Sequence, residues 1–309
     1  MEFKMPLEIR SITKRELTAD VITLPIEELD VSGRLVRYVA TSRQSQKRIR
    51  SLLDKEPLTV PWIETFKPDE VVVDIGANVG MYAVYAGVVG CRVFAFEPEA
   101  LNYAELNKNI FVNDLHGRVT AYCMAITDEA DVSVLHLSQF SYAGSHHDFG
   151  ENWWKADKLI GGRNIERDKR PQQGCVSFSL DELVARQVLP PPNHIKIDVD
   201  GFEYKVVRGA ANTLQQSELK TILLEVDFKI AKSLEIVTHL REQGWKLSEH
   251  QLRINQHEYM PEGKIESLMT RGKGGANFIF FKDDEYFALF EEFAQTFVPP
   301  NPVPAKQGT

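Results

Sequence analysis

The sequence has 309 residues, of which 43% are hydrophobic and 26% are charged, and its formal net charge is -8. This length and composition predict one large α/β domain, or one domain with a small accessory region. The negative charge argues against nucleic acid as a partner. No stretch approaches the roughly 18 uninterrupted apolar residues of a membrane span, and the N-terminus is too charged for a signal peptide. We therefore expect a cytoplasmic protein with no membrane partner.

Three cysteines, Cys91, Cys123 and Cys175, lie far apart, and none belongs to a CxxC motif. Their number and spacing support neither a disulfide framework nor a zinc site. The basic run KRIR at 47–50 is the one obvious candidate for a local basic patch, and we interpret it as a solvated helix face.

Residues 1–69 show short strands, turns and two short helices, a segment too small for a core of its own. We expect an N-terminal cap on a domain that spans 70–283. From Val71 onward strands alternate with helices, which predicts a mostly parallel sheet wound by right-handed crossovers. A third strand is expected at VTAYCMAI (119–126), with DVSVLHL (131–137) as its hairpin partner. The other expected strands are VVVDIG, CRVFAFE, CVSFS, HIKIDVD, TILLEVD, WKLSEH and ANFIFFK.

Two segments, 138–173 and 251–275, interrupt this alternation and are predicted to be insertions on the substrate side. The first is rich in Gly, Asn, Asp, Ser and aromatic residues, and a loop of that length in a compact domain is usually functional or disordered. Its tryptophans favour the functional interpretation. Residues 284–309 are expected to form a C-terminal helix and a frayed, proline-rich tail.

The run VVVDIGANVGMYAVYAG (71–87) predicts a strand, a glycine turn and a helix. Asp74 stands at the carboxyl end of an apolar strand, where sheets of this kind bind ligands. Gly76 and Gly80 let the backbone approach a ligand closely, and Asn78 tolerates turn conformations. The helix N-terminus that follows presents unpaired N–H groups suited to a carboxylate or phosphate. The turn therefore predicts a nucleotide-type cofactor site.

Glu97 ends the second strand, where an acidic residue typically accepts hydrogen bonds from ribose hydroxyls. Dinucleotide sites use G-x-G-x-x-G, whose second glycine makes room for the pyrophosphate, whereas Asn78 stands at that position here. The turn therefore favours S-adenosylmethionine, which has no pyrophosphate. An NAD(P)-binding oxidoreductase and a non-catalytic binding module that retains the fold are the alternative predictions.

The segments DIGANVGMYAVYAG, VFAFEPEALNYAELNKNI, IKIDVDGFEYKVVRGA and LLEVD resemble the FkbM-type S-adenosylmethionine-dependent methyltransferases. The resemblance extends from about Glu56 to Lys282. It implies a Rossmann-like class I methyltransferase fold, with a mostly parallel seven-stranded sheet whose last strand, here ANFIFFK, is antiparallel. It also implies O-methylation of a hydroxyl on a sugar or secondary metabolite, and so a small-molecule acceptor.

By the same resemblance, one set of residues would hold the methionine part of the cofactor: Asp74, Gly76, Asn78 and Gly80. Glu97 would hold the ribose, and the adenine would lie near the end of the third strand, around Ala125 and Ile126. The family motif often has glutamate where this chain has Asp200. Aspartate keeps the charge but shortens the reach by one methylene.

Lys196, Asp198 and Asp200 alternate with apolar residues in IKIDVD, so period two places them on one face of a strand. Leaving such charges buried and unpaired would be costly. A structural Lys196–Asp198 pair is one interpretation, and a catalytic Asp198 beside the transferable methyl is the other. Glu225 ends the next strand, and we expect Asp200 and Glu225 to bind the acceptor. Asp198 and Glu225 could hold a divalent cation, although we favour no dedicated metal.

His146 and His147 are the best histidine candidates for a general base, because imidazole near its ordinary pKa can take a hydroxyl proton. The alternative is that both are surface residues of the loop with no catalytic role. Trp153 in the same loop is expected to form part of the wall that binds the acceptor. The sequence predicts neither the identity of the acceptor nor the oligomeric state.

Overall fold

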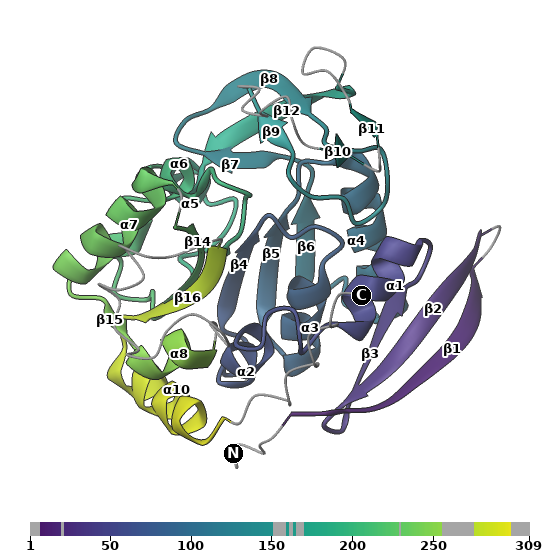
Figure 1. Cartoon of the computed structure of the whole chain (residues 1–309), viewed down its shortest axis with the longest axis horizontal. Helices are drawn as coiled ribbons and strands as arrows, with labels where there is room; N and C mark the ends of the chain where they lie inside the picture. The colour runs from purple at the N-terminus through teal and green to yellow at the C-terminus, as the bar shows by residue number, and fades with distance from the viewer. Residues whose placement is uncertain are drawn as a thin grey trace, which may run out of the picture.

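The computed structural model describes residues 7–19, 22–150, 159–160, 163–164, 170–228, 230–254 and 275–297, and its centre is a seven-stranded sheet (Figure 1). The strand order is β15-β16-β14-β13-β4-β5-β6. Adjacent strands from β14 to β6 are parallel, whereas β16 is antiparallel to both β14 and β15. This mixed sheet agrees with the predicted class of fold. Its strands are β4 (Val71–Ile75), β5 (Arg92–Phe96), β6 (Val119–Tyr122), β13 (His194–Ile197), β14 (Thr221–Asp227), β15 (Lys246–Leu247) and β16 (Gly275–Phe281).

Helices cover both faces of this sheet, because alternate strand residues point to opposite sides. Val72 belongs to an apolar core shared with α3, α4 and α10, whereas Val73 belongs to a second core shared with α5, α6 and α7. None of the helices in the described ranges is long and apolar enough to cross a bilayer. The helices of these layers are α3 (Met81–Val89), α4 (Ala100–Val112), α5 (Leu180–Ala185), α6 (Glu203–Arg208), the 3-10 helix η2 (Thr213–Gln215), α7 (Ala231–Glu242), α8 (Glu249–Ile254) and α10 (Asp284–Thr296).

The N-terminal segment packs directly on the helical layer of α3 and α4. It contains the antiparallel strands β1 (Ile9–Ala19), β2 (Ile22–Val31) and β3 (Arg34–Val39), followed by α1 (Arg43–Arg50) and α2 (Thr59–Glu64). The Tyr38 hydroxyl donates a hydrogen bond to the carbonyl of Met81 at 2.6 Å, and the Val39 N–H donates to Oδ1 of Asn109 at 2.6 Å. These contacts fit a cap on the sheet domain, while the exact boundary at residue 69 stays a prediction.

The expected third strand is wrong in one respect, because its residues divide between two sheets. β6 ends at Tyr122 in the main sheet, and β7 (Ala125–Thr127) enters a separate four-stranded sheet of order β7-β12-β8-β9. The hairpin partner expected for the third strand, β8 (Asp131–His136), pairs instead with β12 (Gln172–Ser179) and β9 (Asp148–Phe149). A short pair, β10 (Leu159–Ile160) and β11 (Arg163–Asn164), belongs to neither sheet. In Figure 1 the four-stranded sheet lies at the end of the main sheet opposite α2 and α10.

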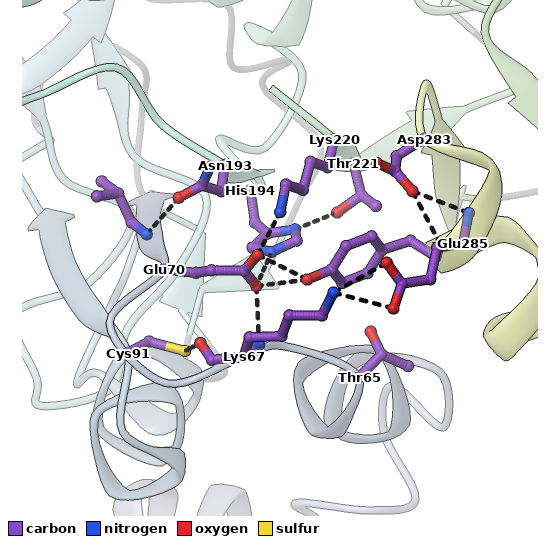
Figure 2. A network of polar contacts seen from close by, with 12 residues as sticks. Thr65, Lys67, Glu70, Cys91, Asn193, His194, Lys220, Thr221, Asp283 and Glu285 are labelled. Carbon is purple, nitrogen blue, oxygen red and sulfur yellow. Dashed lines mark hydrogen bonds and ion pairs between the residues drawn. The ribbon is translucent and has the colours of Figure 1, made fainter. Parts of the chain in front are cut away.

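A buried polar network ties α10 to the amino ends of the central strands (Figure 2). The carboxylate of Glu70 accepts hydrogen bonds from the Lys220 ammonium at 2.5 Å and the Tyr286 hydroxyl at 2.6 Å, and it contacts Nε2 of His194 at 3.0 Å. Burial alone would raise the pKa of Glu70, but its hydrogen-bond partners and the His194 contact lower it below the ordinary range. This network is far from the carboxyl ends of the strands and holds the C-terminal helix in place.

Candidate active site

A cavity of about 560 Å³ lies at the carboxyl ends of the parallel strands. Segments far apart in the sequence meet in its walls, which is typical of ligand sites on open α/β sheets. The lining residues fall within 44–55, 75–78, 96–98, 124–127, 144–149 and 198–205, together with Leu135 and Glu225. The cavity therefore brings together the glycine turn, the histidine loop (residues 144–149, which include His146 and His147) and the acids Asp198 and Glu225 at the strand ends.

The glycine turn needs its glycines for physical reasons that the structure shows. Gly76 has a φ of 81°, and a Cβ on it would lie 1.9 Å from the carbonyl oxygen of Asp198. No side chain fits there, so the turn after β4 and the end of β13 touch backbone to backbone. Gly76 and Asn78 line the cavity. Gly80, the N-cap of α3, turns instead toward Leu106.

Glu97 supports the turn from the end of β5. Its Oε2 accepts the N–H of Asn78 at 2.8 Å, and its Oε1 accepts the N–H of Glu99 at 2.9 Å. Burial raises the pKa of Glu97 to about 7 in spite of these hydrogen bonds. The Asn78 side chain in turn donates to the carbonyl of Gly144 at 2.5 Å, which ties the histidine loop to the turn. Glu97 remains on the cavity wall, where the sequence places it.

Asp74 lies beneath the turn rather than on the wall of the main cavity. Its side chain points to the α3 face, and neither carboxylate oxygen accepts a hydrogen bond from a described residue. Burial raises the pKa of Asp74 to about 6, although the Lys196 ammonium is 4.0 Å away. A small cavity of about 30 Å³ lies beside Lys196, Asp198 and Tyr82. Direct contact of Asp74 with a cofactor stays a prediction.

Of the three charges predicted on one strand face, Lys196 and Asp198 pair with each other at the end of β13. The prediction is wrong for Asp200, because β13 ends at Ile197 and Asp200 lies beyond it at a φ of 55°, where it pairs with His146. The Lys196 ammonium donates to Oδ2 of Asp198 at 2.7 Å, as the structural interpretation expected. Burial would raise the pKa of Asp198, but the charge and hydrogen bond of Lys196 lower it overall. Glu225 hydrogen-bonds Asp198, and burial together with the Asp198 charge raises the pKa of Glu225 well above its usual range. These opposite shifts favour a charged Asp198 beside a protonated Glu225.

No group of three or more His, Cys, Asp or Glu side chains comes together as a metal site within the described ranges. Asp198 and Glu225 provide two carboxyl groups that share a hydrogen bond. Divalent cations such as Mg²⁺ and Ca²⁺ take about six or more oxygen ligands. This donor set does not by itself fit such an ion.

The two predicted histidines have different environments. The backbone N–H of His146 donates to Oδ2 of Asp200 at 2.6 Å, and its Nδ1 lies 2.9 Å from Oδ1 of the same residue. Both residues have positive φ, 63° and 55°. Because Nδ1–H donates to the carboxylate, the lone pair of the neutral His146 ring is on Nε2. This is the tautomer that a general base in the cavity requires.

His147 has the opposite tautomer. Its Nδ1 accepts the N–H of Ser138 at 3.1 Å, so the neutral ring carries its proton on Nε2. Burial lowers the pKa of His147 to about 4. With its one lone pair already engaged, His147 can donate into the cavity but cannot accept a proton there. The prediction of His147 as a base therefore lacks support from its geometry.

The remaining predicted residues are partly on the wall. Ala125 and Ile126 line the cavity, although they do so from β7 and not from a strand of the main sheet. Trp153 and most of the 251–275 insertion lie outside the described residues.

The interpretation of 47–50 as a solvated helix face is only partly right, because the cap contributes to the cavity wall. Gln44, Lys47, Arg48, Ser51 and Lys55 line one wall. Their spacing of three and four residues is the helical period that could have indicated a shared face. The basic run at 47–50 is thus divided: Lys47 and Arg48 face the cavity, while Arg50 pairs with Glu27 at 2.8 Å.

A mixed seven-stranded sheet, a glycine turn after β4, an acid at the end of β5 and a cavity above both define the fold and site of a class I methyltransferase. A family model described as the methyltransferase FkbM domain matches residues 74–247. The chain therefore belongs to the FkbM family of S-adenosylmethionine-dependent methyltransferases.

Individual relatives are distant. The hexuronic acid methyltransferase AglP of Haloferax volcanii is 25% identical over 238 residues, which cover 77% of this chain and 88% of that protein. The 31-O-demethyl-FK506 methyltransferase FkbM of Streptomyces tacrolimicus is 26% identical over 194 residues, covering 58% of this chain and 74% of that one. A crystal structure of methyltransferase FkbM from Methylobacillus flagellatus has 13% identity and a TM-score of 0.42, and covers 78% of this chain and 55% of that chain.

Proposed function

We propose that this protein transfers the methyl group of S-adenosylmethionine to a hydroxyl oxygen of a sugar or a related secondary metabolite. The observation that carries the proposal is one cavity lined by the glycine turn, by the His146–Asp200 pair and by the Asp198–Glu225 pair. The names of the two relatives, one acting on a hexuronic acid and one on demethyl-FK506, support a small-molecule acceptor.

The residues present fit the cofactor. Gly76 lines the cavity and tolerates no side chain, because a Cβ would meet the carbonyl of Asp198. Glu97 offers a carboxyl group to ribose hydroxyls, and Ala125 and Ile126 offer an apolar surface to an adenine ring. When bound, S-adenosylmethionine supplies an electrophilic methyl group on a sulfonium centre. The chain has to align the acceptor with that group and remove one proton.

His146 is the proposed general base. Its Nδ1 lies 2.9 Å from Asp200, which favours the neutral tautomer with the basic lone pair on Nε2, the nitrogen proposed to take the acceptor's hydroxyl proton. The resulting imidazolium would be stabilised by the Asp200 carboxylate, as in other carboxylate–histidine pairs.

Asp198 and Glu225 are proposed to position the acceptor hydroxyls. The proton of Glu225 lies in its hydrogen bond to Asp198, and the remaining carboxyl oxygens of the pair can accept hydrogen bonds from two hydroxyls of a diol. Lys196 keeps Asp198 charged from the side away from the acceptor. Alignment and exclusion of water supply much of the rate of such a displacement.

Cofactor binding is tested first, by titration of the purified protein with S-adenosylmethionine and separately with NADH. We expect saturable binding of the first and none of the second; the reverse result would refute the proposal in favour of an oxidoreductase. Gly76→Ala should weaken the binding, because its Cβ would displace the end of β13.

Transfer is tested with tritiated S-adenosylmethionine and a panel of acceptors: uronic acid glycosides, neutral glycosides and macrolide alcohols. With the acceptor found, His146→Ala should lower kcat by about 100-fold, and His147→Ala, its matched neighbour, should leave more activity. A fall of less than about tenfold for His146→Ala would remove the base assignment. Equal rates with EDTA and with added magnesium are expected; dependence on the metal would revive the Asp198–Glu225 cation site.

A further inference from the structure

The backbone N–H groups of the glycine turn are already hydrogen-bonded within the chain. Every N–H from residue 76 to residue 80 donates to an internal acceptor, at 2.8 to 3.0 Å. The acceptors are the Phe96 carbonyl for Gly76 and Ala77, the Glu97 carboxyl group for Asn78, the Asn78 side chain for Val79 and the Ala77 carbonyl for Gly80. The turn therefore has no N–H left for an anionic ligand.

The start of α3 does not supply the missing donors either. Its first two residues, Met81 and Tyr82, line the small cavity of about 30 Å³ and are not part of the wall of the main cavity. The N–H groups that the sequence predicted to receive a carboxylate at this helix N-terminus are thus not available to a ligand in the main cavity.

S-adenosylmethionine carries a negatively charged carboxylate on its amino-acid end. A charged group that leaves water needs an opposite charge or hydrogen-bond donors from the protein. Since the glycine turn offers neither to a carboxylate, another element of the chain has to bind it.

Among the described residues, three cations line the small cavity beside the turn, and they differ in their partners. The Lys196 ammonium donates to Asp198 at 2.7 Å, and that of Lys55 lies 3.3 Å from the Glu56 carboxylate. The Arg48 guanidinium has no carboxylate within ion-pair distance in the part of the chain that the structure describes. Arg48 is therefore the cation whose charge is available to a ligand.

One hydrogen bond orients the Arg48 side chain. Its Nε donates to the carbonyl of Ala143 at 3.2 Å, and neither terminal nitrogen bonds to a described residue. Arginine binds carboxylates through two parallel N–H···O bonds from one edge of its planar fork. The two terminal nitrogens form such an edge.

Arg48 lies beside the turn, where the amino-acid end of the cofactor is expected. It lines both the small cavity and the main one, and so do Gly76 and Asn78. The Asn78 side chain donates to the carbonyl of Gly144, and Arg48 donates to that of Ala143, the preceding residue. The turn and the cap helix α1 therefore bond to adjacent residues of one loop.

We propose that Arg48 binds the carboxylate of S-adenosylmethionine through the two terminal nitrogens of its guanidinium. The contact rests on the proposed function, because it takes S-adenosylmethionine as the cofactor. Arg48 belongs to α1 and lies outside residues 74–247, which match the family model. The N-terminal cap thus completes the cofactor site.

Two ligands that differ in this carboxylate test the contact: S-adenosylmethionine and its decarboxylated form, which keeps the nucleoside, the sulfonium and the amino group. In calorimetry the full-length wild type should bind S-adenosylmethionine more tightly, by at least about tenfold. Arg48→Gln should lose this preference, because only S-adenosylmethionine binds more weakly. Arg43→Gln, an exposed position of the same helix that lines neither cavity, should keep it.

The decarboxylated ligand also reports whether the variant keeps its fold, since it needs the rest of the site. If Arg48→Gln weakens both ligands equally, Arg48 only holds the loop through Ala143 and the proposal is overturned. A preference that survives in Arg48→Gln overturns it as well. Arg48→Lys keeps the charge without the fork and should reduce the preference; an undiminished preference would exclude the two-nitrogen contact.

The wild type separates this contact from the proposed function. Equal affinity for the two ligands would overturn the role of Arg48 and leave S-adenosylmethionine as the cofactor. Binding of neither ligand would refute the cofactor itself, and with it the proposed methyl transfer.

Discussion

Replacement of Glu225 by glutamine tests the electrostatics of the cavity most directly, since it keeps the size of the side chain and removes the titrating proton. Burial and the nearby charge of Asp198 raise the pKa of Glu225 well above its usual range. The folded chain therefore keeps this proton at pH values at which the unfolded chain has lost it. Where the folded state binds more protons than the unfolded state, stability falls as the pH rises.

The size of this effect follows from proton linkage. One retained proton changes the free energy of unfolding by about 1.4 kcal/mol per pH unit. Between about pH 5 and pH 7 the wild type would lose up to about 2.7 kcal/mol through Glu225. Because the side chain faces a cavity open to water, we expect about 1–2 kcal/mol. Glu225→Gln lacks this loss, so it should be the more stable protein at pH 7, by a margin that shrinks toward pH 5.

Urea unfolding of both proteins, followed by tryptophan fluorescence across this pH range, measures the difference. Glu235→Gln makes the same chemical change on the exposed surface of α7 and controls for the general effect of removing a carboxylate. A difference between wild type and Glu225→Gln that is constant with pH, or that widens toward acid, would show that Glu225 is not protonated in the folded chain.

Three further substitutions have expected outcomes. Glu70→Gln should lower the free energy of unfolding by about 3 kcal/mol, measured by urea unfolding at pH 7. The pKa of Glu70 is lowered on folding, so the wild type loses stability as the pH falls and the difference from Glu70→Gln should narrow in acid. Gly76→Ala forces a Cβ against the Asp198 carbonyl at positive φ. It should weaken S-adenosylmethionine binding at least about tenfold in calorimetry and lower the stability by about 1–3 kcal/mol. An unchanged affinity would contradict the close contact between Gly76 and Asp198. Asp200→Glu keeps the charge but moves the carboxyl group away from His146, so kcat should fall about tenfold or more while cofactor affinity is retained; an unchanged kcat would separate Asp200 from catalysis.

The parts of this site that were predictable from the sequence depend on short-range periodicity. Alternation in HIKIDVD places Lys196 and Asp198 on one face whatever the tertiary structure, and they do form a pair. The turn from Asp74 to Gly80 is equally local, because two glycines and an asparagine at positive φ are coded within seven residues. The position of Asp74 beneath the turn is not local, since it depends on how α3 covers that face.

The contacts that were not predictable join segments distant in sequence. His146 and Asp200 are 54 positions apart, and each has a positive φ that the pattern of residue types does not predict. The run at 119–126 was assigned to one strand. Hydrophobic periodicity cannot reveal that the chain leaves one sheet at Tyr122 and enters another at Ala125. The role of Lys47 in the cavity likewise depends on how the cap docks.

The pKa values of buried carboxyl groups shift in opposite directions at the two ends of the central sheet, and this contrast supports the location of the active site. At the amino ends, Glu70 has hydrogen-bond donors from three elements and its pKa is lowered. At the carboxyl ends the pKa values of Asp74, Glu97 and Glu225 are all raised, chiefly by burial, and that of Glu225 also by the charge of Asp198. Strongly perturbed acids in a cavity mark functional sites when no structural network explains them. Glu97 and Glu225 line the cavity, so a cationic cofactor and a polyhydroxyl acceptor would supply the charge and hydrogen-bond donors that the fold itself leaves out.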